Sequence, residues 1–158
     1  MTRYSRSLMY SATADRVART LEALNCSSIQ FFNFWVVLEE SFKEALHAVR
    51  WQWDAGLAIA RQLPKDTLRR LQVTVVPRST KLSEALLLSS SISWKQLKQT
   101  TRLFPRLREV DIVSTPAKDE CIAHSALLIA QLSLEDMTTD RMELNLGLLD
   151  HQVHPAMM

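Results

Sequence analysis

Glycine is scarce in this chain, which has only Gly56 and Gly147 in 158 residues. At average usage, near 7%, roughly eleven glycines would be expected. Phosphate-binding loops, dinucleotide-binding fingerprints and nucleophile elbows each need several glycines close together. The scarcity therefore excludes these enzyme motifs, and no cofactor or small-molecule substrate is expected.

Cysteine is almost as rare, since Cys26 and Cys121 are the only two. Two cysteines so far apart form neither the disulfide framework of a small secreted protein nor a zinc knuckle. They favour a reducing compartment, so we expect the cytoplasm or the nucleus, and we expect no metal site.

Long hydrophobic runs are also missing. The most apolar run covers 31–38, in which Asn33 is the only polar residue. A membrane-spanning helix needs about 20 apolar residues, so this run predicts a buried helix or strand and no membrane partner.

The net charge is only +2, but the charges are unevenly spread. The stretch 61–81 holds six basic residues and one acid, and 95–108 holds five basic residues and no acid. Solvated faces of separate elements are the expected explanation. The alternative is a weak nucleic-acid binder, which requires the two stretches to form one surface.

The pattern apolar-x-x-apolar-x-apolar occurs four times, beginning at Leu21, Leu46, Leu68 and Leu107. The first two spacings, of 25 and 22 residues, fall in the range of leucine-rich repeats. Residues 71–76 and 110–113 are rich in β-branched side chains and predict strands. The strict alternation of 142–146 predicts another strand.

Helical patterns lie between the predicted strands. Asp54 and Ser93 are candidate N-caps, and Pro64 and Pro105 are candidate stops. The predicted helices cover residues 31–49, 54–63, 94–104 and 119–132. Alternation of helices and strands predicts an α/β fold with a parallel sheet and irregular leucine-rich-repeat-like units. We expect one such domain over 21–148, a polar and disordered N-terminus over 1–20, and a flexible tail over 149–158.

Three segments carry a resemblance to a known family. They are Leu63-Pro-Lys-Asp-Thr-Leu-Arg-Arg-Leu-Gln-Val73, Trp94-x-x-Leu97, and Leu103-Phe-Pro-Arg-Leu-Arg-Glu-Val-Asp-Ile112. Their succession resembles the C-terminal part of fungal F-box and leucine-rich-repeat-like proteins, over about residues 46–146. The resemblance implies the substrate-recruiting arm of a ubiquitin ligase. Because the N-terminus shows no Leu-Pro-Glu opening of an F-box, we expect a fragment or truncated relative of such a receptor.

An aromatic pair is the first candidate for contact with a partner protein. Trp51 and Trp53 would share one face if they lay in a strand, and Arg50 stands beside them. The alternative is that Trp51 lies in the core and Trp53 packs on the next helix.

The second candidate surface comes from the predicted strands. Arg70, Gln72 and Thr74 would project from one strand, with Arg69 where that strand starts. Glu109 and Asp111 would project from the next, with Arg108 beside them.

One pair of residues could carry chemistry. Cys121 and His124 lie three apart on a predicted helix, so they share a face, and a small Cys/His-dependent hydrolase-like enzyme is an alternative function. No oxyanion loop accompanies the pair, so we expect no catalytic residues. The sequence predicts a non-catalytic protein-protein interaction module.

Overall fold

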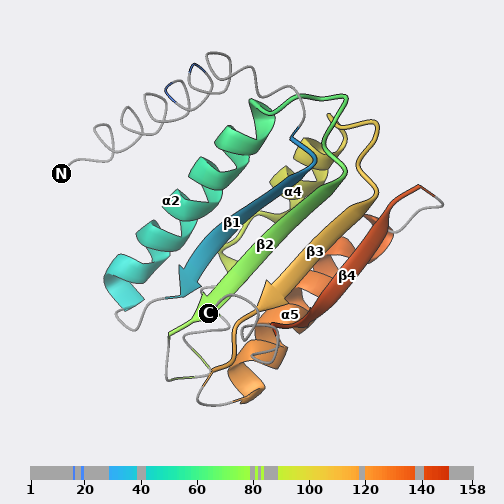
Figure 1. Cartoon of the computed structure of the whole chain (residues 1–158). Helices are drawn as coiled ribbons and strands as arrows, with labels where there is room; N and C mark the ends of the chain where they lie inside the picture. Colours follow the sequence, from blue (N-terminus) through green and yellow to red (C-terminus); the bar gives the residue numbers. More distant parts are fainter. Residues whose placement is uncertain are drawn as a thin grey trace, which may run out of the picture.

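The protein forms a four-stranded parallel sheet in its computed structural model (Figure 1). The structure describes residues 16, 19, 29–38, 42–78, 81, 83, 89–117, 120–137 and 141–149. The strands are β1 (Phe31–Leu38), β2 (Arg70–Pro77), β3 (Glu109–Ser114) and β4 (Glu143–Leu148). Their order in the sheet is the same as their order in the chain. The predicted α/β class and the alternation of short parallel strands with helices are confirmed.

The strands recur with a regular spacing. They begin at residues 31, 70, 109 and 143, so successive starts are 39, 39 and 34 residues apart. The same backbone contact begins each new strand: the amide of Arg70 donates to the carbonyl of Gln30, that of Glu109 to Arg69, and that of Glu143 to Arg108. Successive strands are therefore joined by equivalent backbone contacts at their first residues.

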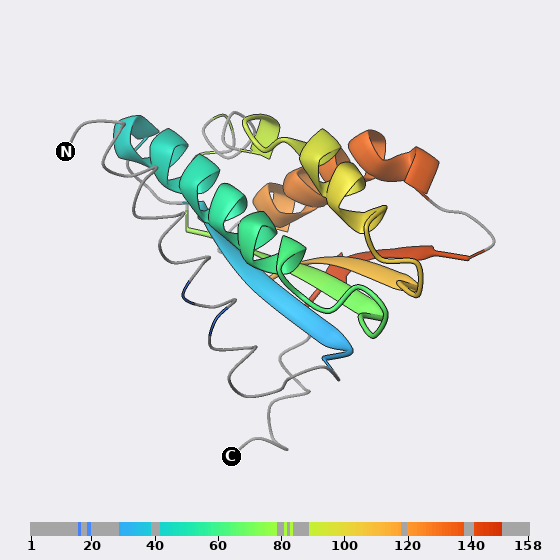
Figure 2. The ribbon, with the colours of Figure 1, turned by 90° about the horizontal axis from the view of Figure 1, so that it is seen from above.

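The three α-helices of the described part cover one face of the sheet (Figure 2). They are α2 (Phe42–Arg61), α4 (Trp94–Thr101) and α5 (Glu120–Leu134), and the 3-10 helix η1 (Glu135–Met137) follows α5. Every connection advances the chain by one strand in the same direction. Because parallel crossovers share one hand, such steps place successive helices on the same face.

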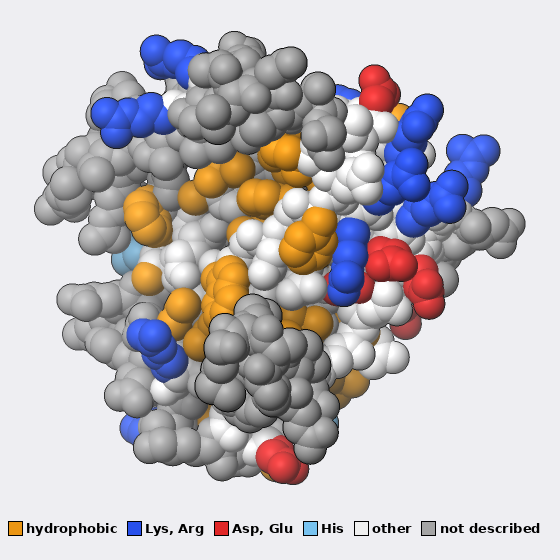
Figure 3. Space-filling view, in the orientation of Figure 1, with side chains coloured by type: hydrophobic (Ala, Val, Ile, Leu, Met, Phe, Trp, Pro, Cys, Tyr) orange, Lys and Arg blue, Asp and Glu red, His pale blue; other side chains and the backbone are white. Residues whose placement is uncertain are grey.

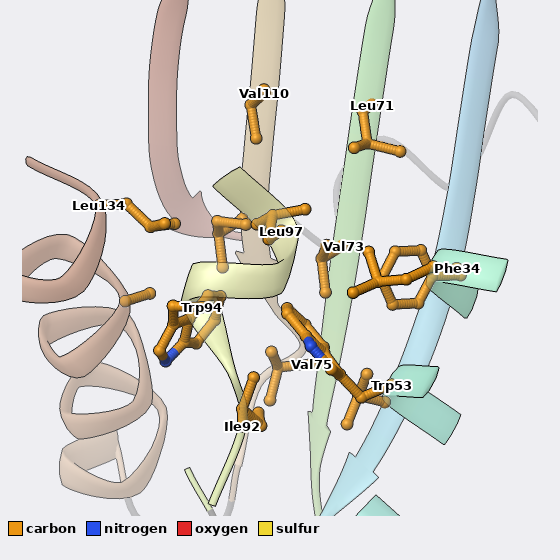
Figure 4. Packing of buried hydrophobic residues seen from close by; sticks show 14 of the residues in the cluster. Phe34, Trp53, Leu71, Val73, Val75, Ile92, Trp94, Leu97, Val110 and Leu134 are labelled. Carbon is orange, nitrogen blue, oxygen red and sulfur yellow. The ribbon is translucent and has the colours of Figure 1, made fainter. Parts of the chain in front are cut away.

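The core lies between this face and the helices (Figure 4). Trp53 of α2 contacts Phe34 of β1 at a ring-centroid distance of 5.6 Å and Trp94 of α4 at 5.1 Å, both edge to face. Its indole nitrogen donates to the carbonyl of Ser93 at 3.1 Å. These aromatic contacts connect β1, α2 and α4, while Leu71, Val73 and Val75 fill the space beneath them.

Gly56 allows α2 to approach β1 closely. A Cβ placed on Gly56 would overlap the ring of Phe34. A glycine inside a helix costs roughly 1 kcal/mol of helix stability relative to alanine. At position 56 this cost accompanies the close packing of α2 against the ring of Phe34 in β1.

A second contact between α2 and β1 protects the edge of the sheet. The amide of Val37 donates to Oε1 of Gln52 at 2.9 Å, and Nε2 of Gln52 donates back to the carbonyl of Val37 at 3.3 Å. Unpaired edge groups are templates for aggregation, and here a side chain occupies two of them.

Several predictions for the N-terminal half were wrong. Residues 31–38 form a strand, which was one of the two elements predicted for this run, and the helix predicted over 31–49 is wrong; residues 46–51, which carry the second copy of the pattern, lie in α2. The helix predicted over 54–63 is the second half of α2, so Asp54 is interior and not an N-cap. An eight-residue apolar run fits either element by periodicity alone, and only its pairing with β2 decides between them.

The boundaries in the C-terminal half were predicted within a few residues. The strands predicted at 71–76, 110–113 and 142–146 correspond to β2, β3 and β4. The helices predicted at 94–104 and 119–132 correspond to α4 and α5. Ser93 occupies the N-cap position of α4, although its side chain makes no capping hydrogen bond. The repeat copy at 21–26 lies outside the described residues, as do nearly all of 1–20 and 149–158.

Candidate interaction surface on the sheet

The sheet has an outer face, which points away from α2, α4 and α5. Since side chains alternate along a strand, one residue in two of each strand lies on this face. They are Phe31, Asn33, Trp35 and Val37 of β1, Arg70, Gln72, Thr74 and Val76 of β2, Glu109, Asp111 and Val113 of β3, and Glu143, Asn145 and Gly147 of β4. The strand register places Asn33, Gln72, Asp111 and Asn145 side by side, as one polar row across the sheet.

Asp111 is the centre of one half of this row. It is only 3% exposed. Arg70 Nε donates to its Oδ2 from β2, and Asn145 Nδ2 donates to its Oδ1 at 2.9 Å from β4. A buried carboxylate is costly unless it is paired and hydrogen-bonded, and here both oxygens have donors.

The other half of the row is held by two hydrogen bonds between β1 and β2 and within β2. Thr74 Oγ1 donates to Asn33 Oδ1 at 3.0 Å, and Gln72 Nε2 donates to Thr74 Oγ1 at 3.2 Å. Side chains from all four strands thus hold one another in place across the outer face.

Apolar side chains lie beside this polar row. Phe31 is 49% exposed and Trp35 is 53% exposed, both on β1. The guanidinium of Arg70 lies 5.3 Å from the centroid of the Phe31 ring, which is a cation–π geometry. Figure 3 views the outer face and shows hydrophobic side chains gathered in its middle, with basic and acidic groups toward the end where the strands begin.

A groove opens at that end of the sheet, with a volume of about 760 Å³. Its lining comes from the segments that lead into three consecutive strands. The lining residues are Arg69, Pro105, Arg106, Leu107, Arg108, Glu109, Arg141, Met142 and Glu143. We call this the arginine groove.

Some of the residues predicted to project from the strands lie at or beside the arginine groove. Arg69 and Arg108 line the arginine groove, and Arg70 lies on the adjoining outer face. The two basic stretches therefore meet in part, because Arg69 belongs to the first, and Arg106 and Arg108 belong to the second. Lys98 of the second stretch lies elsewhere, paired with Asp136 at 2.7 Å.

The prediction that Trp51 and Trp53 form one exposed aromatic pair was wrong. Trp51 and Trp53 lie in α2, where residues two apart point to different sides. Trp53 is 1% exposed and belongs to the core, so it cannot anchor a partner. Trp51 and Arg50 are exposed on α2, which covers the opposite face of the sheet.

Sequence reasoning missed Phe31, Trp35, Asn33 and Asn145 as surface residues. The first three were missed because 31–38 was taken as helical. The signal was present: the pattern apolar-x-x-apolar-x-apolar also begins at Ile29, which is 39 residues before Leu68, as Leu68 is before Leu107. The register that follows from this spacing aligns Asn33 with Gln72.

The two residues proposed for chemistry do not line a common cavity. Cys121 and His124 are both exposed on α5. A shallow, mostly apolar cavity of about 580 Å³ touches His124 but is not lined by Cys121. Within the described residues, no group of three or more His, Cys, Asp or Glu side chains could hold a metal ion.

Within the part of the chain that the structure describes, three ionisable groups have a displaced pKa. Burial raises the pKa of Asp54, and burial together with the nearby Arg61 lowers the pKa of Lys65. The hydrogen bond from Lys98 lowers the pKa of Asp136. None of these three groups lies on the outer face or lines the arginine groove.

Comparisons of the chain with family models, curated proteins and solved structures found no match. Among the described helices, none combines the length and the apolar character that crossing a membrane requires.

Proposed function

We propose that this protein is a non-catalytic, leucine-rich-repeat-like module that binds another protein through the outer face of its sheet. The observation that carries the proposal is the combination on that face of exposed Phe31 and Trp35 with a hydrogen-bonded polar row. The resemblance to F-box and leucine-rich-repeat-like proteins supports the same role, that of a fragment or relative of a ubiquitin-ligase substrate receptor in the cytoplasm or nucleus.

Exposed aromatics on a parallel sheet are the first support. Parallel sheets usually have both faces covered, whereas here α2, α4 and α5 lie together on one side. Tryptophan and arginine dominate the binding energy of protein interfaces, and Trp35 lies two residues from the polar row on the same face.

The fixed geometry of the polar row is the second support. Arg70, Asp111 and Asn145 hold one another across three strands. Side chains that are already ordered lose little entropy on binding, so they can select a partner by shape and hydrogen bonding at low cost.

The partner expected from this chemistry is a protein segment with apolar side chains and neighbouring acidic ones. Its apolar groups would pack on Phe31 and Trp35. Its acidic groups would lie toward the basic end of the sheet, where Arg69, Arg106 and Arg108 are exposed.

The experiment compares two single substitutions of exposed tryptophans. Trp35→Ala removes an indole from the outer face, and Trp51→Ala removes one of similar exposure from α2. Each tagged full-length chain is used as bait in lysate from the protein's own cells, with quantitative mass spectrometry. We expect one protein to bind the wild type and the Trp51→Ala chain, and to fall at least about tenfold with Trp35→Ala.

The captured protein is then purified, and its affinity for the three chains is measured directly. Equal affinity for the Trp35→Ala and wild-type chains would overturn the proposal, as would a loss confined to Trp51→Ala. Circular dichroism of each variant shows that the sheet is intact.

A further inference from the structure

The arginine groove is formed by the segments that precede three consecutive strands. Arg69 precedes β2, Arg106 and Arg108 precede β3, and Arg141 precedes β4. Because successive strands are parallel and adjacent, the segments that lead into them meet at one end of the sheet. Basic residues separated by up to 72 positions in the chain therefore surround one depression.

The groove carries a net positive charge. Four arginines and two acids line it, and all four arginines are exposed. One of the two acids, Glu109, lies 3.6 Å from Arg70 outside the lining, so its charge is partly compensated there. Among the ion pairs of the described residues, none involves Arg69, Arg106 or Arg108.

We propose that the arginine groove binds an acidic peptide segment, through pairs between its guanidinium groups and aspartate or glutamate side chains. This inference rests on the proposed function and names the chemistry of the partner at this end of the sheet. Guanidinium groups bind carboxylates through two parallel hydrogen bonds, so several arginines around one groove favour a ligand with several carboxylates.

The other lining residues favour a peptide over a nucleic acid. Pro105, Leu107 and Met142 give the groove an apolar portion, which suits the aliphatic parts of a peptide. No aromatic residue is among the lining residues. Proteins that bind single-stranded nucleic acids combine basic residues with aromatic side chains on which the bases stack.

The position of the groove fits one continuous partner. Strand pairing aligns Phe31, Arg70, Glu109 and Glu143 as the first row of the outer face, and the last two also line the groove. A segment that packs on Phe31 and Trp35 can therefore extend its acidic residues directly into the groove.

The test uses a fluorescent hexaglutamate peptide and the full-length chain, with fluorescence anisotropy at low ionic strength. We expect saturable binding that weakens as salt is added, because exposed ion pairs are screened. The double substitution Arg106→Gln/Arg108→Gln should weaken binding by at least about tenfold, since it removes two of the carboxylate partners.

The matched control is Lys95→Gln/Arg102→Gln, which removes the same net charge from exposed positions at α4. It should leave hexaglutamate binding within about twofold. Absence of binding to the wild type, or equal weakening by the two double substitutions, would overturn the proposal. Tighter binding of an oligouridylate, lost with Arg106→Gln/Arg108→Gln, would replace the peptide with a nucleic acid and overturn it as well.

The groove and the proposed function can fail separately. Trp35→Ala should leave hexaglutamate binding unchanged, because Trp35 does not line the groove. If the partner depends on Trp35 but hexaglutamate does not bind, only the groove inference fails. If hexaglutamate depends on Arg106 and Arg108 but no partner depends on Trp35, only the proposed function fails.

Discussion

The two faces of β2 divide its residues between the core and the candidate interaction surface. Leu71, Val73 and Val75 point toward the helices and are fully or almost fully buried. Arg70, Gln72 and Thr74 alternate with them on the outer face, where they form hydrogen bonds to β1 and β3 and with each other. A strand of eight residues thus contributes to the core through one set of side chains and to the candidate surface through the other.

The comparison of the two faces shows that burial alone does not distinguish core residues from residues of the candidate surface. Asp111 and Thr74 are as buried as many core residues, yet they are polar and hydrogen-bonded. The covered face is held by apolar packing, which is insensitive to direction. The outer face is held by directional hydrogen bonds, which fix the positions of particular polar groups.

The largest expected effect is on the covered face. Trp53→Ala should lower the free energy of unfolding by about 3–5 kcal/mol, because it opens a cavity among Phe34, Trp94 and the sheet. Urea unfolding followed by circular dichroism measures this loss. Trp51→Ala is the control and should cost less than about 1 kcal/mol. Similar losses in the two variants would mean that the burial of Trp53 is not what stabilises this face.

The next effect compares the two glycines. Gly56→Ala should destabilise the protein by about 1–3 kcal/mol, because the new methyl group overlaps the ring of Phe34. Gly147→Ala on the outer face has no atom within 4 Å of the new methyl group and should leave the free energy of unfolding nearly unchanged. A stabilising Gly56→Ala, as expected for an ordinary helix position, would show that α2 does not press against β1 here.

The smallest of the three effects lies on the outer face. Arg70→Ala should lower the free energy of unfolding by about 1–2 kcal/mol, because it leaves a buried Asp111 with one donor fewer. Glu109→Ala removes the more distant, half-exposed partner of Arg70 and should change stability by less than about 0.5 kcal/mol. Equal effects in denaturant unfolding would mean that Arg70 contributes through its exposed charge and not through Asp111.

The accuracy of the sequence predictions depended on whether a local pattern had one explanation or two. The patterns of 71–76 and 142–146 predicted strands, which the structure confirms, and Arg70 and Gln72 were candidate surface residues of the first strand. The run 31–38 is apolar on both sides, so its periodicity did not distinguish helix from strand. With β1 unassigned, Phe31 and Trp35 could not be placed, and the tryptophans of α2 were placed on a strand that does not exist.

The sequence by itself determined the α/β alternation and the strands β2, β3 and β4, because period-two alternation is a local property of the backbone. Which side chains of β2 and β3 face outward was decided by the tertiary structure. Only the tertiary structure decided that 31–38 is an edge strand and that Trp53 is core. It also decided that Arg69, Arg106, Arg108 and Arg141 meet in one groove. Each of these depends on which distant segments become neighbours, and that is set by strand pairing and helix packing across the whole sheet.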